Sequence, residues 1–449
     1  MKQRNLTQGS ILRNIINFSL PYMLAYLLQI VYGLADLFVI GLYCNVESTT
    51  AVANGAQVMY FVTVVIIGLA MGTTVCTAHA IGANDRDRKA LVVGNTLTLF
   101  ALLSIVLTAV LLLLVPSIVG WMLVPSEAVA DTHRYLRVCF SGIPFIVAYN
   151  VIASIFRGMG DTRTPLQFVA VACVVNVVLD FLFIGTLHLG AMGAALATTL
   201  SQAVSVVYAL LVVRRHREAF GIERSHFRLQ REVVRGMGKI GVPIALQDAF
   251  IQISFIVIAV IANNRGLDDA AAVGIVEKFI GLLFIIPSAM LSTVSAISAQ
   301  CIGAGLRQRA RQTMYAAIAI TFSFGLLWSI MLQFNSEWPV RFFTDNAHVV
   351  QLGGEYLRSY VWDCALAGIH FCFSGFFTAC GYSIVSFAHN VVSIVTARVP
   401  LSYLFSVSYP LTLYPMGWAA PIGSAISVVI CVVAYRALRR RFAPRPSQF

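Results

Sequence analysis

The chain has 449 residues, of which 59% are hydrophobic and only 11% are charged, and its mean hydropathy is +0.82. This composition excludes a soluble globular protein and indicates an integral membrane protein. The net charge of +12 at pH 7 does not indicate a nucleic-acid partner, because the basic loops hold almost no aromatic or base-reading residues.

Apolar runs long enough to cross a bilayer recur along the whole chain, and the polar segments between them are mostly short. They predict an all-α protein of twelve transmembrane helices with no separate soluble domain. The first run continues past Asp36 without a small-residue cleavage site, so we expect it to be a span and not a signal peptide. Kinks are expected at the four prolines within spans, Pro21, Pro144, Pro243 and Pro287. The predicted spans are 14–41, 52–80, 91–115, 134–155, 164–186, 190–213, 240–262, 272–300, 311–333, 354–376, 383–405 and 415–436.

The basic residues are distributed unevenly between the two sides of the membrane. When the loops are assigned alternately, the side with both termini holds 24 of the 31 lysines and arginines, including Lys2, Arg4 and the C-terminal tail. The opposite loops hold only Arg265 and Arg341, together with several acidic residues. The positive-inside rule therefore predicts that both termini are cytoplasmic, and the short loops favour the plasma membrane of a prokaryote, its inner membrane.

The chain also matches itself at an offset of 221 residues. Ile81-Gly82-Ala83 corresponds to Ile302-Gly303-Ala304, and Tyr135-Leu136-Arg137 corresponds to Tyr356-Leu357-Arg358. Such a register predicts two copies of six helices. Because six is even, both copies enter the membrane from the same side and form parallel repeats. We expect a first lobe at 1–213, a basic cytoplasmic linker at 214–239, and a second lobe with a basic tail at 240–449.

Several motifs occur in a characteristic order. These are "YGLAD" in the first span, the paired "AIGANDRDRKA" and "AQCIGAGLRQRAR" loops, "FRGMGDTRTPL", and "NVVLDFLFIG" followed by "GAMGAALATTLSQ". The chain thereby resembles the multidrug and toxic compound extrusion family, from about Leu20 to Val433. The resemblance implies two six-helix bundles around a cavity. It also implies alternating-access antiport of cationic or amphiphilic compounds against inward proton or sodium flow.

Two carboxylates fall within spans of the first lobe at the same predicted depth. Asp36 lies about 8 Å below the outer end of its span at 1.5 Å per residue, and Asp180 and Thr198 fall at that level in the fifth and sixth spans. Asn176 and Tyr32 lie one turn below Asp180 and Asp36 respectively. By the resemblance, Asp36, Asn176, Asp180 and Thr198 match the family's first-lobe cation site, which would hold a shared proton or a sodium ion. The alternative is that these groups only tie helices together.

The second lobe departs from that pattern. One branch of the family has acidic cation ligands there, but the matching positions hold Ile251 and the carboxylate-free region near Ala367. Asp363 is a further ionisable residue of this lobe. Glu277 and Lys278 are adjacent and so point about 100° apart on a helix, which argues against a simple mutual pair. We expect the substrate cavity to include residues from both lobes: Gln29, Tyr32, Tyr149, Asn150, Gln247, Asp248, Glu277, Lys278 and Arg398.

No motif indicates an enzyme or a cofactor site. The string "GMGD" at 158–161 places Asp161 beside arginines at a helix end and not within a span, and the nine cysteines form no CxxC pair. His370 and His389 are expected to be polar groups in helix packing. Two alternatives for the transporter stay open: a lipid-linked oligosaccharide flippase of the wider superfamily, and an exporter of one specialised metabolite. We expect a monomer in the lipid bilayer that carries small organic molecules and requires no cofactor beyond the coupling ion.

Overall fold

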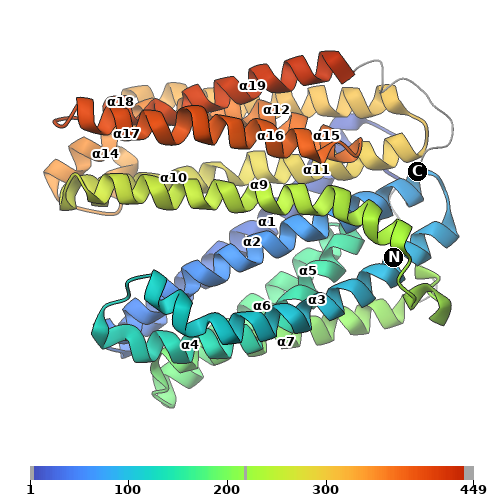
Figure 1. Ribbon diagram of the computed structural model, residues 1–449, viewed down its shortest axis with the longest axis horizontal. Helices are drawn as coiled ribbons and strands as arrows, with labels where there is room; N and C mark the ends of the chain where they lie inside the picture. Colours follow the sequence, from blue (N-terminus) through green and yellow to red (C-terminus); the bar gives the residue numbers. More distant parts are fainter. Residues whose placement is uncertain (1–4, 217–219, 439–449) are drawn as a thin grey trace. The chain divides into compact units, whose positions relative to one another are not determined.

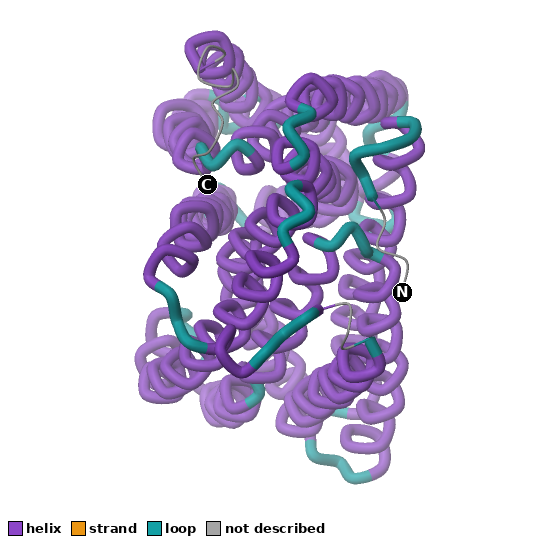
Figure 2. Tube along the Cα trace, turned by 90° about the vertical axis from the view of Figure 1, so that its right-hand side faces the viewer, coloured by secondary structure: helices purple, strands orange, loops and turns teal. Residues whose placement is uncertain are grey.

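The computed structural model describes residues 5–216 and 220–438, and within these ranges every regular element is helical (Figure 2). In these two ranges eleven helices are long and apolar enough to cross a membrane, or up to twelve if a bent pair is taken as one span. That pair is Ser126–Ser141 with Ile143–Gly158, bent by 46°. The twelve predicted spans are therefore confirmed. Lys2, Arg4 and the tail beyond Leu438 lie outside the described residues.

The chain divides into two compact units. The first contains Leu20–Gly238, and the second contains Leu6–Ser19 together with the residues from Lys239 onward. The chain therefore passes from one unit to the other within α1 (Ile11–Tyr43) and again within α9 (Arg231–Asn263). These boundaries differ from the predicted ones, because residues 6–19 pack in the second unit and residues 220–238 pack in the first.

The first unit is built from six predicted spans, which Figure 1 shows as long helices from blue to green. Asn45 and Asp85 begin the second and third spans as N-caps, since their side chains accept hydrogen bonds from the amides of Ser48 and Arg88. The fourth span breaks at Gly142, just before Pro144. The elements after α1 are α2 (Val46–Gly82), α3 (Arg86–Trp121), η1 (Ser126–Ala128), α4 (Val129–Ser141), α5 (Ile143–Gly158), α6 (Arg163–Asp180), η2 (Phe181–Thr186), α7 (Gly190–Arg215) and η3 (Arg224–Phe227).

The second unit repeats the pattern with more interruptions. Its eighth span breaks at Phe284, just before Pro287, whereas Pro21 and Pro243 lie inside the continuous helices α1 and α9. After α9 the elements are α10 (Leu267–Leu283), α11 (Ile285–Gly303), α12 (Arg307–Phe334), α13 (Trp338–Arg341), α14 (Ala347–Tyr360), α15 (Trp362–Ala379), α16 (Ser383–Ser393), η4 (Ile394–Arg398), α17 (Val399–Ser408), α18 (Tyr414–Gly417) and α19 (Ala419–Leu438).

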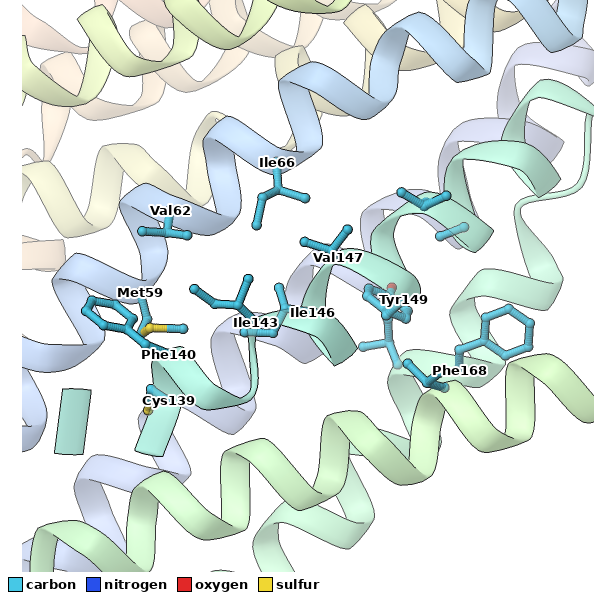
Figure 3. Packing of buried hydrophobic residues seen from close by; sticks show 14 of the residues in the cluster. Met59, Val62, Ile66, Cys139, Phe140, Ile143, Ile146, Val147, Tyr149 and Phe168 are labelled. Carbon is cyan, nitrogen blue, oxygen red and sulfur yellow. The ribbon is translucent and has the colours of Figure 1, made fainter. Parts of the chain in front are cut away.

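An apolar core joins the helices of the first unit. Val62 and Ile66 of α2 point toward Ile143 and Val147 of α5, as Figure 3 shows. All four side chains are less than 9% exposed, and van der Waals packing of this kind holds membrane helices together. Packing of this density gives the unit a rigid frame on which polar side chains can be held in place.

Helix α15 packs closely against its neighbours in the second unit. A Cβ added at Gly375 would lie 2.5 Å from the backbone oxygen of Leu291 in α11, and one at Gly368 would lie 2.8 Å from Cβ of Thr321 in α12. Glycine is therefore needed at both positions, as is typical where membrane helices approach closely. This packing fixes α15, which carries Asp363 and His370.

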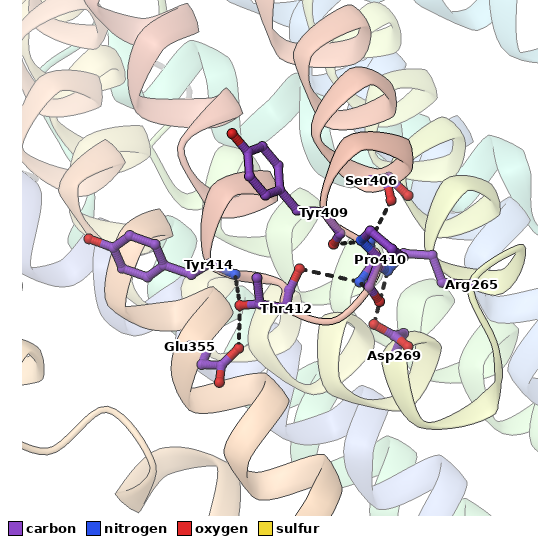
Figure 4. Close-up of polar contacts among 8 residues, drawn as sticks. All are labelled: Arg265, Asp269, Glu355, Ser406, Tyr409, Pro410, Thr412 and Tyr414. Carbon is purple, nitrogen blue, oxygen red and sulfur yellow. Dashed lines mark hydrogen bonds and ion pairs between the residues drawn. The ribbon is translucent and has the colours of Figure 1, made fainter.

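One end of the second unit is held together by Arg265, in the turn between α9 and α10 (Figure 4). Its Nε donates to Asp269 at 2.9 Å. Nη1 and Nη2 donate to the backbone carbonyls of Ser406, in the last turn of α17, and of Tyr409, Pro410 and Thr412, which lie between α17 and α18. All five N–H groups of the guanidinium are thus used.

Candidate functional site

The predicted coupling residues of the first unit come together from three helices. Asp36 of α1 is 6% exposed, and the hydroxyl of Thr198 in α7 donates to its Oδ2 at 3.2 Å. The Asp36 carboxylate also interacts with the side chains of Asp180 and Asn176 in α6. The common depth expected for Asp36, Asp180 and Thr198 therefore corresponds to real proximity.

The backbone of α6 changes at this site. Asp180 is the last residue of α6, and it is followed directly by η2, a π-helical segment. Asn176 lies one turn earlier, and both side chains are 0% exposed. A π-helical turn within a helix is uncommon and is often found at functional sites. Here the π-helical segment η2 begins directly after Asp180, whose carboxylate interacts with Asp36.

Several polar atoms at this site are buried without a hydrogen-bond partner among the described residues. They are Oδ1 of Asp36, both carboxylate oxygens of Asp180, and both amide atoms of Asn176. Buried polar groups are normally hydrogen-bonded, so this concentration needs an explanation. Two interacting carboxylates away from water repel each other unless a proton or a cation is bound between them. The oxygens of Asp36, Asp180, Asn176 and Thr198 are of the kind that binds a hard cation, and the carboxylates can bind a proton.

Three of the cavity candidates lie around a small hollow in the same unit. Gln29, Tyr149 and Asn150 line a cavity of about 20 Å³, and the side chains of Gln29 and Tyr149 interact. Tyr32 is half-buried and interacts electrostatically with both Asp36 and Tyr149. Tyr32 does not line the hollow, and the substrate role predicted for it stays a prediction.

Arg157 also lines this hollow and was not among the cavity residues predicted from the sequence. Its guanidinium lies 5.3 Å from the ring centre of Tyr22, which is a cation–π distance. The only signal in the sequence was its position at the end of the fourth span, where basic residues are common in any membrane protein.

The second unit holds a larger cavity of about 50 Å³, and Arg398 and Asp363 both line it. Among the other candidates, Glu277 interacts with Arg398. Gln247 is 1% exposed, Asp248 is half-buried and Lys278 is exposed, and none of these three lines the cavity. The substrate roles predicted for Gln247, Asp248 and Lys278 stay predictions.

One histidine and three serines line this cavity, and a second histidine lies close to the first. His370 lines it, with Nε2 3.3 Å from the hydroxyl oxygen of Ser424, and Ser424 donates to Asp363. His389 lies behind, 2.8 Å from the hydroxyl of Ser374, and the two imidazole rings are 5.4 Å apart. From the sequence, both histidines are predicted to be packing groups. The spacing of seven residues between Asp363 and His370, two turns of one helix, was the signal that could have joined them.

No group of three or more histidine, cysteine, aspartate or glutamate side chains is placed to hold a metal ion in the part of the chain that the structure describes. The sodium site predicted at Asp36, Asn176, Asp180 and Thr198 stays a prediction.

Comparison with known proteins agrees with this architecture. The sequence model of the family described as MatE matches the chain twice, at residues 21–182 and 243–404. The two matches are of equal length and follow the repeat. An outward-facing structure of a multidrug resistance MATE family transporter of the MOP superfamily has a TM-score of 0.91, at 23% identity and with 99% of each chain covered, and shows that the fold is shared.

Curated relatives extend over nearly the same length. The probable multidrug resistance protein YpnP of Bacillus subtilis (strain 168) is 28% identical over 407 residues, which cover 90% of this chain and 91% of the relative. The FAD transporter of Shewanella oneidensis is 25% identical over 418 residues, with 90% and 91% covered. The chain is a multi-pass membrane protein, and with a family match to each of its two repeats it belongs to the MatE family of multidrug and toxic compound extrusion transporters.

Proposed function

We propose that the protein is a secondary active antiporter that exports cationic or amphiphilic compounds in exchange for H+ or Na+. The observation that carries this proposal is the interaction of Asp36 with Asp180 inside the first unit, where their remaining oxygens have no hydrogen-bond partner among the described residues. One ion bound there neutralises one of the two negative charges, and its departure leaves two buried carboxylates that repel each other. The site thus has two states of different energy, which alternating access requires.

In the proposed cycle, an ion enters from outside and binds Asp36 and Asp180, with Thr198 and Asn176 orienting them. The substrate leaves from the neighbouring hollow of the same unit, which Gln29 and Tyr149 line. Release of the ion on the cytoplasmic side restores the charged site. The direction follows from the proposed orientation, with both termini cytoplasmic in the inner membrane of a prokaryote, which the distribution of basic residues supports.

The experiment that tests this proposal is dye export in proteoliposomes. The purified full-length protein is given a fluorescent organic cation under an imposed proton gradient or an imposed sodium gradient. We expect one gradient to drive transport in the wild type, and Asp36→Asn and Asp180→Asn to abolish the coupling. The matched control is Asp85→Asn, the same change at the N-cap of α3, where asparagine caps a helix as well as aspartate does.

Each outcome has a definite meaning. Proton-driven transport lost in Asp36→Asn identifies a proton antiporter, and sodium-driven transport makes Asn176 and Thr198 ligands of the ion. Transport that stays coupled in both aspartate variants would show that the site has another role.

A second candidate function is export of one specialised metabolite, which the similarity to the FAD transporter favours. No dye movement under either gradient, together with flavin nucleotide export, would support this candidate.

A further inference from the structure

Arg398 places a positive charge inside the second unit. It ends η4, the π-helical segment of the eleventh span. Its Nη2 donates to the hydroxyl of Tyr360 in α14 at 2.7 Å, and its guanidinium carbon lies 4.4 Å from the ring centre of Phe255 in α9. Three helical elements therefore fix one cation. Arginine stays protonated under all physiological conditions, so this charge is permanent.

Two carboxylates of the same unit face this cation. Asp363 of α15 is 1% exposed and lines the cavity of about 50 Å³ together with Arg398. Glu277 of α10 has a buried oxygen with no hydrogen-bond partner among the described residues. Both carboxylates interact electrostatically with Arg398, although neither forms an ion pair with it within 4 Å in the described residues. The other titratable groups that interact with these charges include Tyr356, Tyr360, Cys364 and His370.

The first unit has the opposite arrangement. The groups that interact with Asp36 are a second carboxylate, an amide and a hydroxyl, and none of them is a cation. We propose that Arg398 is a tethered cation, which does for the acidic groups of the second unit what a bound coupling ion does for those of the first. Arg398 thereby confines the coupling ion to the first unit. This inference rests on the proposed function for the role of Asp36 and Asp180, but its test does not measure transport.

The physical reason is the high free energy of an uncompensated charge away from water. Removal of one partner from a buried set of charges is strongly destabilising, whereas removal of both partners is much less so. Without Arg398, Asp363 and Glu277 would have to take up a proton or a metal cation in order to stay buried. The thermal stability of the second unit, which does not depend on sodium while Arg398 is present, should then depend on it.

The test uses the full-length protein in detergent with Asp36→Asn and Asp180→Asn present throughout, so that any ion response arises outside the first-unit site. Thermal unfolding is followed by tryptophan fluorescence at pH 6 and pH 8, in NaCl or in N-methylglucamine chloride of equal ionic strength. Three further changes are compared in this background: Arg398→Gln, Arg398→Gln with Asp363→Asn, and Arg341→Gln. The last is the control, because Arg341 pairs with Glu337 at 2.7 Å on the protein surface, where such pairs contribute little.

We expect the background protein to show no sodium response. Arg398→Gln should lower the apparent Tm by several degrees at pH 8 without sodium, and sodium or pH 6 should recover part of this loss. Adding Asp363→Asn should recover part of the Tm and reduce the ion response, because Glu277 is then the only one of the two carboxylates left without its cation, and Arg341→Gln should change nothing.

Two results would overturn the inference. One is a loss in Arg398→Gln that neither sodium, nor pH 6, nor Asp363→Asn recovers, and the other is a sodium response in the background protein while Arg398 is in place. If Arg398→Gln alone does not fold, folding of the Arg398→Gln, Asp363→Asn protein supports the tethered cation, and failure of both rejects it. The proposed function fails separately, when Asp36→Asn keeps coupled transport.

Discussion

Single side chains decide how the first-unit site treats an ion. Thr198 donates a hydrogen bond to Asp36 at 3.2 Å, whereas its neighbour Thr199 donates to the carbonyl of Val138 at 3.5 Å. A hydrogen bond to a charged group is worth about 1.5–3 kcal/mol. The hydroxyl oxygen of Thr198 can also bind a cation. Removal of this hydroxyl therefore changes the free energy of the charged carboxylate and that of the ion-bound state by different amounts.

At this scale we predict that Thr198→Val changes the apparent affinity for the coupling ion by about tenfold, since 1.4 kcal/mol corresponds to tenfold. Valine keeps the shape of threonine but has no hydroxyl. The measurement is the ion-concentration dependence of dye export in proteoliposomes, and the matched control is Thr199→Val. Equal affinities in Thr198→Val and the wild type would mean that the hydroxyl is not part of the site.

At the level of the elements, the described residues 220–238 between the two halves of the sequence pack on the first unit. Their 3₁₀ turn η3 lies on α3. The side-chain Nδ2 of Asn95 in α3 donates to the backbone carbonyls of His226 and Arg228, and Oδ1 of Asn95 accepts from the backbone N–H of Gln230 at 2.6 Å. A Cβ at Gly94 would collide with the carbonyl of His226. The close approach of the linker thus requires glycine at one position of α3 and an amide at the next.

We predict that Asn95→Leu releases this segment. Loss of several hydrogen bonds of about 1 kcal/mol each should raise the rate of tryptic cleavage at Arg224 and Arg228 by at least about tenfold. The measurement is limited proteolysis of the purified protein, analysed by mass spectrometry. Ser104→Ala is the control, because Ser104 is equally buried on α3 but bonds only to Ala101 of its own helix. Unchanged cleavage in Asn95→Leu would show that the docking contributes little.

At the scale of the whole molecule, the division into packed units does not follow the division of the sequence into repeats. The first nine residues of α1 belong to the second unit, where Ile15 and Phe18 are 0% and 2% exposed within a cluster that includes Val294 and Phe377. The N-terminal helix is therefore shared between both units.

We predict that Phe18→Ala destabilises the second unit and leaves the first largely unchanged. Truncation of a buried phenylalanine costs about 3–5 kcal/mol where the cavity cannot collapse. Hydrogen–deuterium exchange should rise in α11 and α15 and stay constant in α5. Leu20→Ala is the control, since Leu20 is 52% exposed only two residues further along. Faster exchange confined to α2 and α5 would contradict the assignment of this segment.

Much of the fold followed from the sequence, because the signals concerned are local. A span needs a continuous apolar run to satisfy its backbone in lipid, so all twelve could be located from hydropathy. The depth of Asp36, Asp180 and Thr198 followed from counting residues along helices of known direction. The breaks before Pro144 and Pro287 were also predictable, whereas Pro21 and Pro243 did not interrupt their helices, since a proline in a membrane helix can be accommodated by its neighbours.

The sequence by itself determined the membrane class, the twelve helices, the repeat and the level of the two carboxylates, all of which depend on order and spacing along one chain. Only the tertiary structure decided that Phe18 packs with Phe377, that Asn95 holds the linker, and that Arg398 faces Asp363 and Glu277. These relations join residues that lie far apart in the sequence. They depend on how each helix is rotated about its axis, and that rotation is set by packing against the other helices and not by hydropathy.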